Sequence, residues 1–164
     1  MSTGQRIRTT EAPAYVGQQV KMAGWLHLVR RLGSIGFLVL RDGWGTFQAV
    51  IEDAEQLNIL SQLQPESVIA VAGTVVAEAQ APGGLELHGC RVTAINAVEE
   101  VLPFEINKKV LKAGLDTFLD HASVGLRYPT KRATFRLFGG ILAAFREYLA
   151  GAGFTEIQTP KLVG

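Results

Sequence analysis

The order of patterns in this sequence predicts a mainly β fold followed by an α+β tail. Up to about residue 103, apolar and polar residues alternate in short runs, which is the period of a β-strand with one buried face. Turns that contain glycine separate these runs, and one stretch among them has helical spacing instead. After residue 103 the sequence changes to a loose stretch and then to a clear helix.

Five runs are predicted to be strands, at residues 20–31, 35–42, 46–51, 67–78 and 85–95. The stretch 53–63 is predicted to be a helix, because Leu57, Leu60 and Leu63 recur at helical spacing behind Asp53, a residue that can cap its first turn. Three strands, one short helix and two strands form the layout of an OB-fold, a small five-stranded Greek-key barrel. OB-folds bind oligonucleotides or oligosaccharides across their second and third strands.

The outward faces of the first three strands are therefore the place to look for binding residues. The side chains expected there are Trp25, His27, Val29, Phe37, Thr46, Gln48 and Val50. An aromatic ring beside an amide and an imidazole suits the recognition of single-stranded RNA, and Arg30 and Arg31 lie nearby for phosphates or bases. Composition alone favours a core position for Phe37, because the run 35–42 is apolar on both faces.

Composition restricts the function further. The net charge is +1, and no apolar run approaches the ~18 residues of a membrane span. The N-terminus lacks the apolar stretch of a signal peptide, so we expect a cytoplasmic protein with no membrane partner. The single cysteine, Cys90, excludes an internal disulfide and a cysteine-based zinc site. Residues 1–104 hold seven Lys/Arg against ten Asp/Glu, whereas residues 105–164 hold nine against five.

Three blocks of sequence, taken together, resemble a known family. The first, residues 24–42 (GWLHLVRRLGSIGFLVLRD) with 45–51 (GTFQAVI), resembles the anticodon-binding domain of class IIb aminoacyl-tRNA synthetases, and its aspartyl branch in particular. The second, residues 115–129, is similar to the hinge of aspartyl-tRNA synthetases of the archaeal type. The third, residues 153–162, resembles class II motif 1, whose proline would be Pro160. The blocks stand in the expected order and extend over almost the whole chain.

The resemblance implies that the chain recognises the anticodon as part of an aspartate–tRNA ligase. Phe37 matches the aromatic residue that stacks on the middle anticodon base, a uridine, and Gln48 matches the glutamine that hydrogen-bonds the edge of this base. Arg30 matches a basic residue that contacts the anticodon. His27 and Pro82 match two positions that govern discrimination at the third anticodon base, which is C for aspartate and U for asparagine.

The residues at those two positions resemble members of the family that charge both tRNAs. Proline has neither a side-chain donor nor a backbone N–H, so Pro82 cannot reject a base by hydrogen bonding. The resemblance therefore implies a relaxed, non-discriminating aspartyl-tRNA synthetase whose partners are tRNA(Asp) and tRNA(Asn). Residues 82–84, Pro-Gly-Gly, also have a purely structural explanation, because this sequence favours a turn.

The resemblance divides the chain into an OB-fold anticodon-binding domain (1–103), a hinge (104–130) and the start of a class II catalytic domain (131–164). A helix is predicted at 133–150 and a strand at 154–159, which ends at Pro160. In the family these elements build the homodimer interface. By themselves, residues 105–164 are expected to be poorly ordered or to self-associate through the apolar face of that helix.

Motifs 2 and 3, whose arginines bind ATP in the family, have no match in this sequence. The acidic residues that hold Mg²⁺ with ATP are also expected elsewhere, and the histidines show no metal-ligand spacing. We therefore expect no catalytic or metal-binding residue in this chain, no bound ATP, and no amino acid activation by the chain alone. The intact enzyme would form aspartyl-adenylate from ATP and transfer aspartate to tRNA.

Two other functions stay open. One is asparaginyl-tRNA synthetase, whose barrel is a close relative, although the turn at 31–33 and the segment 115–129 argue against it. The other is a free-standing OB-fold protein that binds single-stranded nucleic acid without catalysis.

Overall fold

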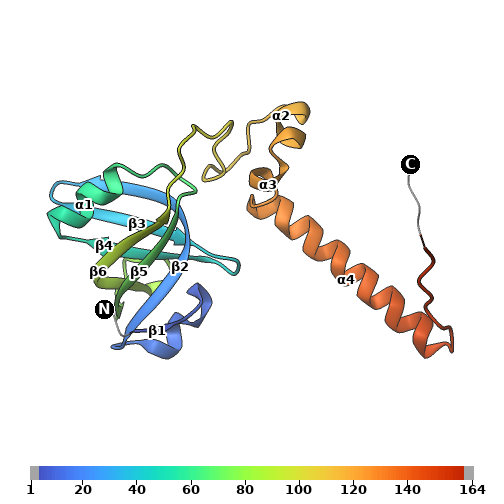
Figure 1. The fold of residues 1–164 in the computed structure, drawn as a ribbon. Coiled ribbons are helices and arrows are strands. Elements are labelled where there is room, and N and C mark those ends of the chain that lie inside the picture. Colours follow the sequence, from blue (N-terminus) through green and yellow to red (C-terminus); the bar gives the residue numbers. More distant parts are fainter. Residues whose placement is uncertain (1–3, 161–164) are drawn as a thin grey trace. The chain divides into compact units, whose positions relative to one another are not determined.

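The computed structural model describes residues 4–160 and divides into two compact units, with the division between Val101 and Leu102. The strands belong to the first unit, and the second unit contains the three helices α2, α3 and α4 among the described residues. Figure 1 shows both units, coloured along the sequence. The finer division of the sequence at residues 103 and 130 stays a prediction.

Five strands of the first unit close into a barrel, which confirms the predicted fold class. They are β2 (Gln19–Leu32), β3 (Ile35–Arg41), β4 (Thr46–Ile51), β5 (Val68–Ala77) and β6 (Leu85–Asn96). Their order is β2–β3–β4–β6–β5, and β5 pairs with β2 to complete the ring. β4 and β6 run parallel, whereas the other neighbours in the ring are antiparallel. Closure of this kind removes the free strand edges at which other chains could pair.

Alternate side chains of the strands fill the barrel, and α1 (Ala54–Ser61) packs Leu57 and Leu60 against them. The largest fully buried side chains are Met22, Leu26, Leu38, Leu40, Ile51, Ile69 and Leu87. Asp53 caps α1 as predicted, since its Oδ1 accepts hydrogen bonds from the backbone N–H groups of Glu55 (2.7 Å) and Gln56 (3.2 Å). The side chain of Gln56 in turn accepts a 2.7 Å bond from the backbone of Val92, which ties α1 to β6.

A β-bulge in β2 changes the direction of the side chains that follow it. Leu26 pairs with Leu40 and Leu28 pairs with Val39, so His27 is an extra residue opposite β3. Beyond the bulge the alternation is shifted by one residue, and Val29 packs against the core. The expectation that Val29 points outward is therefore wrong, because Leu28 and Arg30 take the outward positions.

β2 is long enough to serve both sides of the barrel. Its first half pairs with β5 as far as Trp25, and its second half pairs with β3 from Trp25 onward. Gly24 lies at this change of partner, where a Cβ atom would overlap the carbonyl oxygen of Arg41. A glycine is therefore required at this position, as is common where a strand bends at the corner of a barrel.

Asp42 holds an N-terminal segment that the sequence did not predict. This segment consists of β1 (Gln5–Arg6), which pairs with β2, and the 3₁₀ helix η1 (Thr9–Tyr15). The carboxylate of Asp42 accepts bonds of 2.8 Å from both the backbone N–H and the hydroxyl of Thr9. It also accepts bonds from the backbone of Trp44 (2.7 Å) and Gly45 (2.8 Å), in the β3–β4 turn. Asp42 therefore both stabilises the β3–β4 turn and anchors the N-terminal segment.

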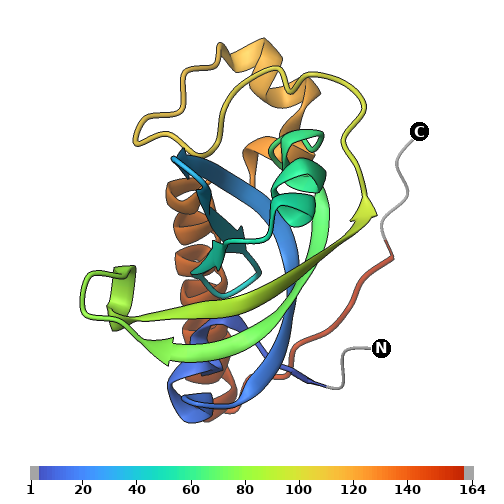
Figure 2. The same ribbon diagram turned by 90° about the vertical axis from the view of Figure 1, so that its left-hand side faces the viewer.

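The β5–β6 hairpin extends beyond the barrel and carries Pro82 at its tip, in the 3₁₀ turn η2 (Pro82–Gly84) (Figure 2). Gly83 has a φ of +78°, which glycine adopts at little cost. At the base of the hairpin, Glu86 and His88 belong to the part of β6 that adjoins β4.

The second unit contains α2 (Leu115–Asp120), α3 (Ala122–Gly125) and α4 (Pro129–Gly151). Its small core consists of Phe104, Ile106 and Tyr128, and the Tyr128 hydroxyl donates a 2.6 Å bond to the carbonyl of Lys109. The predicted helix at 133–150 is confirmed, and it begins about one turn earlier with Pro129 at its start, where the missing N–H costs no helical bond.

The strand predicted at 154–159 is wrong for this structure, in which residues 154–160 have no regular secondary structure. A strand requires a neighbouring strand for its hydrogen bonds, and none of the strands in residues 4–160 pairs with this segment. None of the helices in the described part of the chain combines the length and hydropathy that a membrane crossing requires.

Candidate nucleic-acid interface

The outward residues of β2, β3 and β4 form three rows across the sheet, which we call the reading face. Each row joins one residue of each strand: Arg30, Phe37 and Val50; Leu28, Val39 and Gln48; Trp25, Arg41 and Thr46. Val50 and Arg41 share this side of the strands but are themselves buried. The partners on the inner side of the same strands, such as Leu38 and Ala49, belong to the buried core. The structure thus brings three of the predicted site residues, Arg30, Phe37 and Gln48, onto one face.

Phe37 is half-buried on the reading face, with Arg30 directly opposite on β2 and Val50 directly opposite on β4. Composition favoured a core position for this ring, but the alternation along β3 places it outward. A ring supported on both sides by strand neighbours loses little freedom when a base stacks on it. Arg30 is exposed beside it, where a guanidinium can bind a phosphate or stack on a base.

Gln48 is connected to two residues that sequence reasoning did not select. Its Nε2 donates a 2.8 Å hydrogen bond to Oε2 of Glu86, and Nε2 of His88 lies 2.7 Å from Oε1 of the same carboxylate. The Glu86 side chain is only 6% exposed, whereas that of His88 is 38% exposed. Glu86 therefore lies beneath the two more accessible side chains and links them. We call these three residues the Gln48–Glu86–His88 cluster.

The sequence contained one signal for this cluster. Glu86 and His88 stand two residues apart in a predicted strand, so they share a face. That this face adjoins Gln48 depends on the parallel contact of β4 with β6, in which Ala49 pairs with Leu87. Such a contact, between strands almost forty residues apart in the sequence, has no local signature.

His27 is held by a buried ion pair between Arg41, a residue of the reading face, and Glu66. Arg41 donates a 3.1 Å bond from Nη1 to Nδ1 of His27 and a 2.8 Å bond from Nη2 to Oε2 of Glu66. The side chains of Arg41 and Glu66 are 3% and 2% exposed, and the guanidinium lies 5.4 Å from the ring of Trp25. Because a guanidinium has no acceptor, Nδ1 of His27 must be the acceptor, and the ring proton resides on Nε2.

The environment also keeps His27 uncharged. Burial lowers the pKa of His27, and the positive charge of Arg41 lowers it further, against a smaller opposing effect of Glu66. Near neutral pH the side chain is therefore a neutral imidazole with an Nε2–H donor. It cannot attract phosphate as a cation.

The other two predicted site residues, Pro82 and Pro160, belong to segments outside the strands of the reading face. Pro82 is exposed in η2, four residues before Glu86 in the sequence. Pro160 is exposed and is the last residue that the structure describes, in the second unit. The roles of all six predicted site residues stay predictions, because the fold gives their positions and not their ligands.

Cys90 shows no sign of a nucleophilic role. Burial raises the pKa of its thiol to about 12, so the reactive thiolate is absent at neutral pH. Within residues 4–160, no three His, Cys, Asp or Glu side chains gather in a group that could hold a metal ion. The reading face and the adjoining His27 instead offer aromatic rings, an amide, an imidazole and a guanidinium. These groups bind nucleic-acid bases and suit a recognition surface.

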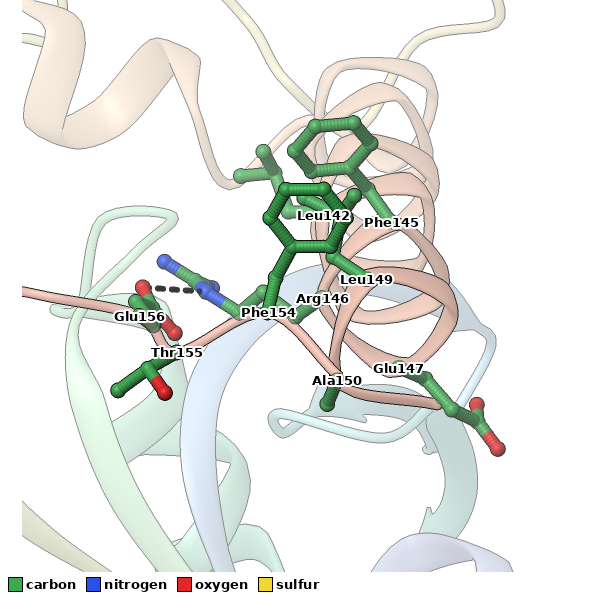
Figure 3. A pocket seen from close by; sticks show the side chains of 9 residues that line it. All are labelled: Leu142, Phe145, Arg146, Glu147, Leu149, Ala150, Phe154, Thr155 and Glu156. Carbon is green, nitrogen blue, oxygen red and sulfur yellow. Dashed lines mark hydrogen bonds and ion pairs between the residues drawn. The ribbon is translucent and has the colours of Figure 1, made fainter. Parts of the chain in front are cut away.

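A hollow of about 540 Å³ in the second unit differs chemically from the reading face (Figure 3). It lies between α4 and the segment after it, and its wall is mainly apolar, with Leu142, Phe145 and Phe154. Arg146 and Glu156 form a 3.0 Å ion pair across its edge. These side chains offer a surface for packing and no group of metal ligands.

Comparisons with known proteins agree with this geometry. Residues 20–95 match the tRNA anticodon family, which is described as "OB-fold nucleic acid binding domain". The chain is 38% identical over 163 residues to the aspartate–tRNA(Asp/Asn) ligase of Archaeoglobus fulgidus, and 40% identical over 158 residues to that of Thermus thermophilus. Each alignment covers 96% of this chain but only 38% and 36% of the two relatives. The chain thus spans little more than a third of the curated relatives it matches.

Solved structures of related synthetases also match nearly the whole of this chain and less than half of their own length. Asparaginyl-tRNA synthetase from Pyrococcus horikoshii matches with a TM-score of 0.84 at 31% identity, over 99% of this chain and 39% of that one. Aspartyl tRNA synthetase from Entamoeba histolytica matches with a TM-score of 0.84 at 26% identity, over 96% of this chain and 40% of that one.

Proposed function

We propose that the chain binds the anticodon of tRNA, because residues 20–95 match the tRNA anticodon family of OB-fold nucleic acid binding domains. The chain is homologous to part of the aspartate–tRNA(Asp/Asn) ligases, which makes the aspartate anticodon the first candidate. The observation that carries the proposal is that Phe37, Gln48 and Arg30 share the reading face.

Each of these side chains has a distinct task in the proposed complex. The ring of Phe37 stacks on the middle base of the anticodon, a uridine, and contributes about 1–3 kcal/mol. The amide of Gln48 hydrogen-bonds the Watson–Crick edge of this base, which stacking leaves accessible. Arg30, exposed beside Phe37, contacts the anticodon backbone or a neighbouring base.

We propose that the third anticodon base is read loosely, so that tRNA(Asp) and tRNA(Asn) both bind. The bond from Arg41 fixes His27 as an Nε2–H donor. Cytosine and uracil both carry an O2 acceptor at the same place on the ring, so a donor directed at O2 does not separate them. Pro82 adds no donor that could do so.

We propose further that the intact protein is a cytoplasmic aspartate–tRNA ligase, which forms aspartyl-adenylate with ATP and Mg²⁺ and then acylates tRNA. The described residues do not fit ATP–Mg²⁺, since they hold no acidic cluster for the metal, and the sequence has no match to the two motifs whose arginines bind ATP in the resembling family. This chain would then supply recognition and not activation. The exposed apolar face of α4, with Phe135, Phe138 and Phe145, supports homodimerisation through this region and Pro160.

Asparaginyl-tRNA synthetase is the second candidate, because a solved example at 31% identity matches nearly the whole chain. The tRNAs of both candidate enzymes carry uridine as the middle anticodon base, and the two enzymes differ in the amino acid that they would activate. The reading face alone therefore serves either function.

Fluorescence anisotropy of the 164-residue chain with three labelled anticodon stem-loops tests the proposal. The loops carry the aspartate anticodon, the asparagine anticodon, and the aspartate anticodon with its middle uridine changed to adenosine. We expect similar dissociation constants for the first two loops and much weaker binding of the third. Equal binding of all three loops would indicate a general single-strand binder, and a strong preference for the aspartate loop would contradict the roles of His27 and Pro82.

The variant Phe37→Ala tests the stacking directly. Loss of about 1–3 kcal/mol raises the dissociation constant of the aspartate loop about 5- to 150-fold. Phe135→Ala is the matched control, because it removes an exposed ring of the same kind from α4. An unchanged affinity in Phe37→Ala would remove this residue from the interface.

A further inference from the structure

Glu86 stands out because it is a buried carboxylate in direct contact with Gln48, a residue of the face proposed to bind a polyanion. Only 6% of its side chain is exposed, and both of its oxygens have partners: Oε2 faces Gln48 at 2.8 Å and Oε1 faces His88 at 2.7 Å. A buried acid at a nucleic-acid interface opposes phosphate binding. Its position against Gln48 indicates a task other than electrostatic attraction.

The chemical consequence of this contact is a fixed amide orientation. A carboxylate has acceptors and no donor, so it accepts a hydrogen bond from Nε2 of Gln48 and repels its Oε1. The amide therefore cannot rotate by 180° without losing its bond to Glu86. His88 holds the other carboxylate oxygen, which keeps Glu86 itself in place.

We propose that Glu86 is a positioning residue that makes Gln48 select uracil over cytosine at the middle anticodon base. The inference rests on the proposed function. Uracil presents the N3–H donor beside the O4 acceptor, and a fixed amide can offer Oε1 to the former and its second Nε2–H to the latter. Cytosine presents the reverse pair, the N3 acceptor beside the N4 amino donor. A flipped amide would match cytosine equally well, so the choice between the two pyrimidines depends on the constraint that Glu86 applies.

Glu86→Gln is the discriminating variant. It keeps the size of the side chain, but its amide can donate to or accept from Gln48, so both orientations of Gln48 become possible. The measurement is the ratio of the dissociation constants for two stem-loops that differ only in U or C at the middle position. We expect a ratio of about tenfold or more in the unmodified chain, as for a good bidentate contact to a base. In Glu86→Gln we expect the ratio to fall to about threefold or less, chiefly because the C loop binds more tightly.

Three further variants separate positioning from other effects. Glu100→Gln removes an exposed negative charge outside the strands and should leave the ratio unchanged, which controls for general attraction of RNA. In a Gln48→Ala background, Glu86→Gln should have no further effect on the ratio, because the amide that it orients is gone. If Glu86→Gln fails to fold, Glu86→Asp provides the test, since it keeps the charge but withdraws the carboxylate from Gln48.

The outcomes are distinct. If the unmodified chain binds neither loop, the proposed function fails. If it binds both loops equally, anticodon-loop binding stands and the role of Glu86 is overturned. If the U/C ratio survives in Glu86→Gln, or if both loops lose affinity by the same factor, Glu86 is only a structural residue and the inference is again overturned.

Discussion

The buried ion pair between Arg41 and Glu66 predicts how much stability the protein loses when one partner is removed. The two groups lie 2.8 Å apart with side-chain exposures of 3% and 2%, so water cannot replace a lost partner. Glu66→Ala leaves the Arg41 guanidinium as a buried charge, and removal of one partner from such a pair typically costs about 3–5 kcal/mol. The bond to His27 and the ring of Trp25 still stabilise the guanidinium, which favours the lower end of this range. We therefore expect Glu66→Ala to lower the free energy of unfolding by about 3 kcal/mol, which lowers Tm by roughly 12–24 °C for a domain of this size.

Urea unfolding followed by tryptophan fluorescence measures this loss, because both tryptophans, Trp25 and Trp44, lie in the first unit. Glu11→Ala is the matched control: Glu11 pairs with Arg8 at 4.0 Å on the surface and should cost at most about 1 kcal/mol. The double variant Arg41→Met with Glu66→Leu should be more stable than Glu66→Ala alone, because no buried charge is left. A cost below about 1 kcal/mol for Glu66→Ala would refute the claim that this pair is a buried and interdependent unit.

Three further predictions follow from single contacts. Gly24→Ala should lower stability by about 1–3 kcal/mol in thermal unfolding, since its Cβ overlaps the Arg41 carbonyl, whereas Gly43→Ala, with open space around it, should not. Burial opposes ionisation of Asp42, but the hydrogen bonds from Thr9, Trp44 and Gly45 lower its pKa below 3.8 on balance. The stabilisation by the ionised Asp42 side chain is therefore present at neutral pH and is lost as the pH falls through its pKa in the folded state. The difference in unfolding free energy between Asp42→Asn and the unmodified chain should be smaller at pH 3 than at pH 7, and an equal difference at both pH values would contradict this. By NMR titration, His27 should show a pKa below 6.5, and Arg41→Met should raise it; an unchanged value would remove Arg41 as a cause.

Local patterns predicted the strands well, because alternation is a property of neighbouring residues. The run predicted at 46–51 coincides with β4, and the run predicted at 35–42 differs from β3 by one residue. Phe37 and Gln48 could be placed on one face for the same reason. Asp53 could be identified as a helix cap because its partners are two and three residues away.

The errors and omissions concern contacts that have no local signal. The bulge at His27 inserts one residue among apolar neighbours, and Leu28 and Val29 suit either face equally well. Glu66 lies 25 residues from Arg41, and Glu86 lies 38 residues from Gln48, so only the closed barrel brings these pairs together. The segment after α4 has the composition of a strand but no strand to pair with among the described residues.

The two buried carboxylates in contact with residues of the reading face, Glu66 and Glu86, bear on how binding should respond to salt. Most nucleic-acid-binding surfaces gain affinity by releasing counterions from phosphates, and the slope of log K against log salt counts the phosphates neutralised. Residues 1–104 carry more acidic than basic side chains, and the guanidinium of Arg41 is already committed to Glu66. A barrel of this kind should therefore show a shallow slope for a stem-loop, on the order of one to two phosphates. Its affinity would come from the bases themselves and would persist at salt concentrations that release nonspecific RNA.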